Sequence, residues 1–317
     1  MRSVLRELVR CGNFDVQITV AGAAISLQIE FPVKHMVYCL VDGDSCASMA
    51  KTTSILTSDM ATIFSNDKPD CVLIHADRYE MLAVAIAASY LNIPILHSEG
   101  FEDTGTIDDK VRYAISSLAD IHFVTTRSAL LKSDFYHGVK GKAHVVGSTA
   151  LDGLTYTSFM GDYAVILHHP NTTDPEDITP LIEAVESLDM PKVWVNPNVD
   201  AGSKTMLKKI HQLPDVQFQK DLPPDKYINL IRKCRVLIGN TSSMIKEGAF
   251  LGIPSVLVGN RQMGRETGTN VVHSPMSKDV ILEMIYLQLK HGRYEQDLRF
   301  GDGHASERIR KILEEVI

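Results

Sequence analysis

The sequence is poor in cysteine, and its few cysteines are not arranged in pairs. Five occur among 317 residues, an odd number without any Cys-X-X-Cys spacing. This pattern argues against a disulfide framework and against a zinc site, and it is typical of a reducing cytoplasm. The cysteines are Cys11, Cys39, Cys46, Cys71 and Cys234.

Long apolar runs are also lacking. The longest, from Met81 to Leu96, is interrupted by Ser89, Asn92 and Pro94 and is too short to cross a bilayer. Residues 1–13 include four charged side chains, so they do not form the apolar core of a secretory signal. We therefore expect a soluble, cytoplasmic protein without a membrane partner.

Positive charge is in deficit, since 32 Lys and Arg stand against 39 Asp and Glu, a net charge of −7. That sign is wrong for a protein that binds nucleic acid by neutralising phosphates. The length of 317 residues exceeds the size at which one hydrophobic core usually stops growing. Two domains of about 150 residues each are expected.

Short β-branched runs ending in glycine or polar residues alternate with longer segments of helical period. This alternation is typical of an α/β fold with parallel sheets. We expect two Rossmann-like domains, residues 1–148 and 149–300, and a closing helix within residues 301–317. The predicted strands are 15–20, 71–75, 93–97, 121–125, 143–146, 164–168, 192–196, 216–219, 236–239, 255–258 and 271–273.

The N-terminus departs from this alternation. Val4, Leu5, Leu8 and Val9 have helical spacing, and no strand candidate precedes them, whereas a doubly wound domain normally begins with a strand. We expect either that this fold starts late or that its first strand is missing. The stretch 22–44 shows no clear period and is predicted to be irregular.

Acidic residues follow two predicted strands at the ends where open α/β sheets bind ligands. If these strands are parallel neighbours, Asp77 and Glu99 converge and could exchange protons with a substrate. The alternative for each is a helix cap or a pair with Arg78 or Lys110. Their joint occurrence favours catalysis. Asp109 begins a predicted helix, where capping is the commoner explanation, but its loop can reach the same place.

In the second domain, His168 and His169 end the strand 164–168. Adjacent strand residues point to opposite faces, so only one should meet a ligand, where it could neutralise a diphosphate. No further Cys or His lies at metal-ligand spacing around them, so we expect no metal.

A strand-to-helix turn rich in hydroxyl residues follows the strand 236–239. Ser242 and Ser243 can form an anion site for a nucleotide diphosphate, although an ordinary N-cap is the commoner meaning of such residues. Glu247 could accept hydrogen bonds from a ribose. Arg261 and Arg265 could contact phosphate.

Taken together, these segments resemble the hydrolysing UDP-N-acetylglucosamine 2-epimerases, in collinear order from about residue 68 to the C-terminus. The matching pieces are His75-Ala76-Asp77-Arg78, His97-Ser98-Glu99-Gly100, Thr104-Gly105-Thr106-Ile107-Asp108-Asp109, His169-Pro170, Asn198-Val199-Asp200-Ala201-Gly202-Ser203-Lys204, Gly239 to Glu247, and Gly264-Arg265-Glu266-Thr267-Gly268.

The resemblance implies a glycosyltransferase-B-like architecture, with two Rossmann-like domains facing across a cleft and UDP held mainly by the second. It implies a reaction without metal or cofactor. UDP leaves with loss of the C2 proton to give 2-acetamidoglucal, and water then adds with inversion at C2. By position, the acid and base candidates are Asp77, Glu99 and Asp109, with His169 on the diphosphate side. The UDP-binding candidates are Arg78, Ser242, Ser243, Glu247 and Arg261.

The resemblance also implies a UDP-N-acetylglucosamine or related UDP-sugar substrate and a homo-oligomer, either dimer or tetramer. The sequence departs from the family in three places. The Asn-Arg-Ala-Asp-Tyr-like segment is absent, residues 22–25 replace a Gly-Ser-His-Leu-like loop, and Phe101 stands where a second glycine is usual. Two alternatives stay open: a glycosyltransferase of the same architecture, and a non-catalytic UDP-sugar-binding protein.

Overall fold

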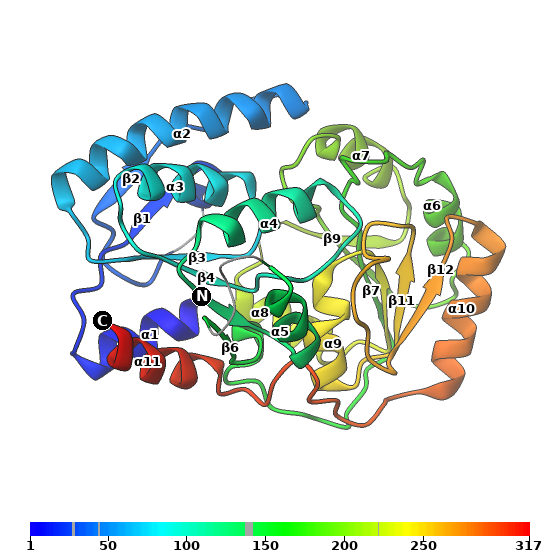
Figure 1. The fold of residues 1–317 in the computed structure, drawn as a ribbon. Helices are drawn as coiled ribbons and strands as arrows, with labels where there is room; N and C mark the ends of the chain where they lie inside the picture. The colour runs from blue at the N-terminus through cyan, green and yellow to red at the C-terminus, as the bar shows by residue number, and fades with distance from the viewer. Residues whose placement is uncertain (27–28, 44, 137–141, 221) are drawn as a thin grey trace. The chain divides into compact units, whose positions relative to one another are not determined.

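The computed structural model describes residues 1–26, 29–43, 45–136, 142–220 and 222–317. Contacts between residues divide the chain into two compact units. Unit 1 comprises residues 1–103, 107–154 and 300–317, and unit 2 comprises residues 104–106 and 155–299. Each unit contains parallel β-structure covered by helices, coloured from blue to red along the chain in Figure 1.

Unit 1 contains a four-stranded parallel sheet of order β3-β4-β5-β6 and a separate parallel pair, β1 and β2. The strands are β1 (Thr19–Ala21), β2 (His35–Val37), β3 (Val72–His75), β4 (Ile95–Ser98), β5 (Ile121–Val124) and β6 (Ala143–Val145). The helices are α1 (Arg2–Cys11), η1 (Gly22–Ser26), α2 (Cys46–Asp67), α3 (Tyr79–Tyr90), α4 (Ile107–Leu118), α5 (Arg127–Asp134), η2 (Thr149–Leu151) and α11 (Ala305–Val316), where η marks a 3₁₀ helix.

Unit 2 has a six-stranded parallel sheet of order β12-β11-β10-β7-β8-β9. The strands are β7 (Ala164–Leu167), β8 (Lys192–Val195), β9 (Val216–Gln219), β10 (Val236–Gly239), β11 (Ser255–Val258) and β12 (Val271–Ser274). The helices are α6 (Thr179–Glu186), α7 (Ser203–Ile210), α8 (Pro224–Ile231), η3 (Ser242–Met244), α9 (Lys246–Leu251) and α10 (Lys278–His291).

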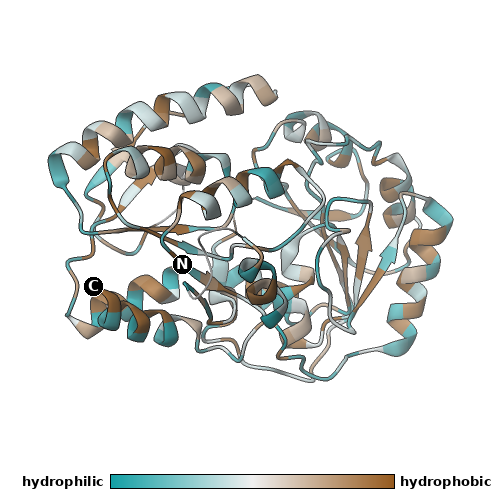
Figure 2. Ribbon diagram, in the orientation of Figure 1, coloured by the Kyte–Doolittle hydropathy of each residue, from teal (hydrophilic) through white to brown (hydrophobic). Residues whose placement is uncertain are grey.

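The central strands of unit 2 are almost entirely apolar because helices cover both faces of a parallel sheet. Every residue of β7, β10 and β11 is buried, and β7 and β11 are largely brown in the hydropathy colouring of Figure 2. The strand order reverses between β7 and β10, because β8 and β9 extend to one side and β11 and β12 to the other. Ligands of doubly wound sheets bind at such a reversal, beyond the carboxyl ends of the strands.

The predicted α/β class with two Rossmann-like domains is confirmed. The N-terminal helix predicted from Val4 to Val9 is also present, as α1, which ends at Gly12 in the left-handed conformation. The prediction that residues 22–44 are irregular is wrong in part, because η1 and β2 lie within them. With only three residues, β2 is too short to show a strand period.

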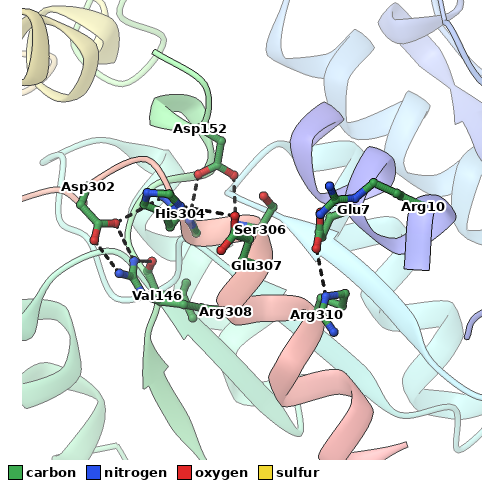
Figure 3. A network of polar contacts seen from close by, with 11 residues as sticks. Glu7, Arg10, Val146, Asp152, Asp302, His304, Ser306, Glu307, Arg308 and Arg310 are labelled. Carbon is green, nitrogen blue, oxygen red and sulfur yellow. Dashed lines mark hydrogen bonds and ion pairs between the residues drawn. The ribbon is translucent and has the colours of Figure 1, made fainter. Parts of the chain in front are cut away.

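The C-terminal helix α11 belongs to unit 1, although it follows unit 2 in the sequence. It packs beside α1, and Val4, Leu8, Ile309 and Leu313 share one buried cluster. Asp152 caps α11 by accepting the Ala305 and Ser306 amides at 2.8 and 2.9 Å, as Figure 3 shows. The unit is therefore built from both ends of the chain.

Among the helices of the described residues, none combines the length and apolar character needed to cross a membrane.

Candidate active site

The strands that precede Asp77 and Glu99 are parallel neighbours in unit 1. β3 pairs with β4 so that His75 lies opposite Ser98, and the Ala76 amide donates to the Ser98 carbonyl at 2.9 Å. Asp77 and Glu99 thus leave the sheet at the same edge, as the sequence predicted.

Asp77 and Asp109 are joined by a third residue, Arg112 of α4. Its guanidinium is buried and donates to Asp77, to Asp109 at 2.8 Å, and to the main-chain oxygen of Glu102. Asp77 therefore forms an ion pair with Arg112, a partner that the sequence analysis did not name.

Arg112 was not predicted as a site residue. Its signal was the spacing of three residues from Asp109, which places the two side chains on one helix face. Among the predicted UDP-binding residues, Arg78 donates from its Nε to Oε2 of Glu80 at 3.0 Å.

Glu99 has a different environment from the other two carboxylates. Its Oε1 accepts the Ser148 hydroxyl at 2.7 Å, and Ser148 is completely buried. Glu99 has a positive φ of 63°, as does Phe101 at 60°. Such angles are uncommon outside glycine, which gives a physical reason for glycine at position 101 in the resembled family.

The ring of Phe101 is buried in a cluster of aromatic rings. Tyr136, Tyr113 and His122 lie at centroid distances of 5.4, 5.9 and 5.1 Å, all edge to face. These contacts offset part of the strain of the left-handed backbone, since an aromatic pair contributes about 0.5–1.5 kcal/mol beyond its buried area.

In unit 2, the histidine pair after β7 has one buried and one partly exposed member, as the alternation predicted. His168 is buried, and burial together with the charge of Arg261 lowers its pKa to about 3. The Nδ1 of His169 accepts a hydrogen bond from the main-chain N–H of Asn198 at 3.1 Å, so the neutral ring has its proton on Nε2.

Asn240, the first residue after β10, was not predicted as a site residue. It holds His169 through hydrogen bonds to the main chain. Its side chain accepts the His169 amide at 2.7 Å and donates to the His169 carbonyl at 2.8 Å, which determines the orientation of its amide. Its own carbonyl accepts Arg261 Nη1 and Gln262 Nε2, both at 3.3 Å. His169 and Arg261 are therefore linked through one buried residue.

The hydroxyl turn after Asn240 forms the short helix η3. Ser243 is buried, and its hydroxyl bonds to Tyr227 and, at 3.1 Å, to Thr241. Ser242 is partly exposed. Gly239, just before the turn, has φ 139°, and a Cβ there would collide with the Leu167 carbonyl, so only glycine fits.

The model of the family described as UDP-N-acetylglucosamine 2-epimerase matches residues 6–314. The chain belongs to this family. A UDP-N,N'-diacetylbacillosamine 2-epimerase (hydrolyzing) of Legionella pneumophila is 29% identical, with 100% of this chain and 92% of that protein covered. A UDP-N-acetylglucosamine 2-epimerase of Neisseria meningitidis serogroup B is 26% identical, with 78% and 71% covered.

Solved epimerase structures show the same fold. The Methanocaldococcus jannaschii UDP-GlcNAc 2-epimerase, solved with UDP-GlcNAc and UDP, has a TM-score of 0.73 at 14% identity, covering 95% of this chain and 100% of that one. The Neisseria meningitidis enzyme bound to UDP-GlcNAc has a TM-score of 0.71 at 17% identity, covering 94% and 99%. The sequence analysis found the resemblance to the epimerases from about residue 68 onward. The family match shows that it extends over nearly the whole sequence.

Proposed function

We propose that the protein is a hydrolysing epimerase that converts UDP-N-acetylglucosamine and water into N-acetylmannosamine and UDP. The observation that supports this most directly concerns the three candidate carboxylates of unit 1. They have different hydrogen-bond partners, and Asp77 and Glu99 follow neighbouring strands at the same edge of the sheet. Asp77 and Asp109 share the buried Arg112, while Glu99 is bound to a buried hydroxyl. Reactions that remove and return protons on carbon need acid and base groups in distinct environments.

The proposed reaction has two balanced steps. A carboxylate takes the proton from C2 while the bond between C1 and the diphosphate oxygen breaks, which gives 2-acetamidoglucal and UDP. Water then adds its hydroxyl to C1 and gives its remaining proton to a carboxylate, while a carboxylic acid returns a proton to C2 on the opposite face. We assign the proton transfers to Asp77, Glu99 and Asp109.

The hydrolysing outcome is favoured by the names of relatives. The Legionella protein, and one from Campylobacter jejuni that is 25% identical, are both named hydrolyzing. Their names also include diacetylbacillosamine, so a diacetamido UDP-sugar is the second substrate to test.

UDP is assigned to residues of unit 2, with His169 beside the diphosphate. Ser242, Ser243, Glu247 and Arg261 would hold the nucleotide, and we retain Arg78 of unit 1 as a further contact. The Asn240 network supports this assignment because it links His169 and Arg261. The absence of a free-sugar product, with UDP still bound, would favour the non-catalytic alternative.

The test is incubation with UDP-N-acetylglucosamine in D₂O, followed by proton NMR of the sugar products. We expect N-acetylmannosamine with deuterium at C2, because the returning proton comes from solvent. Glu99→Gln keeps size and polarity but removes the carboxylate, so kcat should fall at least about 10²-fold. The control Glu307→Gln lies on the exposed face of α11 and should be fully active. Product without deuterium would refute the elimination route.

The nucleotide assignment has its own test by calorimetry with UDP. Ser242→Asp adds a negative charge at the proposed diphosphate turn and should weaken binding at least about tenfold. The control Ser187→Asp adds the same charge to an exposed serine after α6, at the opposite sheet edge. Equal affinity in both variants would place UDP elsewhere.

A further inference from the structure

A buried histidine that the proposed chemistry does not use lies behind the carboxylates of unit 1. His97 of β4 is completely buried. Its Nε2 lies 2.9 Å from the carbonyl of Ala76, which can only accept, so Nε2 bears the proton. Its Nδ1 therefore accepts the Ser116 hydroxyl, at 3.0 Å. Both ring nitrogens are engaged by one neutral tautomer.

These two hydrogen bonds reach separate segments that bear candidate carboxylates. Ala76 immediately precedes Asp77 at the end of β3. Ser116 lies on α4, one helical turn after Arg112. Its hydrogen bond to His97 therefore attaches the helix that holds Asp109.

The third segment is attached to His97 directly, because Glu99 follows it by two residues. Gly100 lets this loop fold over the imidazole. A Cβ at Gly100 would lie 3.1 Å from Nδ1 of His97 and 2.9 Å from the Ser116 hydroxyl oxygen. Any side chain there would push the ring and the loop apart. All three segments therefore meet at one imidazole.

The backbone on both sides of the ring is held in an unfavourable conformation. Ala76 has φ 60° and Glu99 has φ 63°. The left-handed region is unfavourable for a residue other than glycine, so surrounding contacts must maintain it. The bond from His97 to the Ala76 carbonyl is such a contact, and it acts one residue before Asp77.

We propose that His97 is a positioning residue that sets Asp77, Glu99 and Asp109 in their reactive geometry, without touching the substrate. This inference rests on the proposed function for its catalytic readout. Its structural content is separate: His97 maintains the left-handed corner at Ala76. Burial lowers the pKa of His97 to about 4, so the ring keeps the neutral form that both bonds require at neutral pH.

The chain offers a matched control in His122 of β5. It too is completely buried, and its ring lies 6.3 Å from that of His97. Within the described residues, neither ring nitrogen of His122 has a hydrogen-bond partner. The same substitution at the two positions therefore removes similar buried volume, but only at His97 does it remove bonds to the carboxylate segments.

The experiment compares His97→Asn, His97→Gln and His122→Asn in the full chain. Asparagine places its amide near Nδ1 and cannot reach Ala76, whereas glutamine can place a donor near Nε2. We expect His97→Asn to lower kcat at least about 10²-fold with KM within about threefold, since small misplacement of reacting groups has effects of this size. His97→Gln should retain at least about a tenth of kcat, and His122→Asn should stay within about twofold.

A second readout does not depend on activity. Hydrogen exchange of the Ala76 amide, which donates to Ser98, should accelerate in His97→Asn and remain slow in His122→Asn. Equal exchange in these two variants, or equal loss of kcat, would overturn the proposal. If wild type has no epimerase activity but the exchange difference is found, the proposed function fails and the positioning role at Ala76 stands. If His97→Asn does not fold, His97→Met fills the site without a donor and has the same expected results.

Discussion

Replacing Arg112 by methionine tests whether the acidic site of unit 1 depends on one buried guanidinium. Methionine fills much of the space but leaves Asp77, Asp109 and the Glu102 carbonyl without their donor. Removing one partner of a buried ion pair costs about 3–5 kcal/mol. Arg112 is 1% exposed, but Asp77 and Asp109 are 18% and 21% exposed and keep some hydration. We therefore expect the lower end, about 3 kcal/mol.

The assay is native-state hydrogen exchange of α4 at increasing urea, which reports the opening of unit 1 itself. The only tryptophan, Trp194, lies in unit 2, so its fluorescence follows the other unit. A matched control exists in Arg310, which also joins two carboxylates, Glu7 and Glu314, but is 21% exposed. Because its ion pairs are better hydrated, Arg310→Met should cost less than Arg112→Met. If Arg112→Met costs no more than Arg310→Met, the reasoning from burial is refuted.

Two further predictions concern stability. Asp152→Ala removes the cap of α11 and should reduce the opening free energy of that helix by about 1 kcal/mol, measured by exchange of the α11 amides. Burial lowers the pKa values of His97, His122 and His168 to about 4, 3 and 3. The unfolded chain, with histidine pKa about 6.5, binds more protons between these values, so stability should fall as pH decreases from about 6.5 to 4. Urea unfolding at pH 7 and pH 5 measures this change in the free energy of unfolding. His122→Gln should make the free energy of unfolding depend less on pH, and an unchanged dependence would contradict the prediction.

The sequence predicted most strands because their buried β-branched runs are long enough to be distinctive. It also predicted the shared edge of Asp77 and Glu99, because parallel neighbours end together. The spacing of Arg112 from Asp109 indicates their pairing, but its burial and its bond to Asp77 could not be predicted, since a helical arginine is usually exposed and its burial depends on how α4 packs. Likewise, nothing local marks Asn240 as the residue that joins β7 to Arg261. Such roles arise from tertiary contacts between segments far apart in sequence.

The placement of α11 in unit 1 has a consequence for synthesis on the ribosome. Residues 155–299 of unit 2 form one continuous segment that leaves the ribosome before residues 300–317. The first half of the chain must therefore wait, with the apolar face of α1 lacking its partner, until residues 300–317 have also emerged. Unit 2 can therefore complete its core first, whereas unit 1, although its synthesis begins earlier, reaches its final packing only once α11 has emerged. A nascent chain that has emerged from the ribosome only as far as residue 299 would consequently display a complete second unit and an incomplete first one.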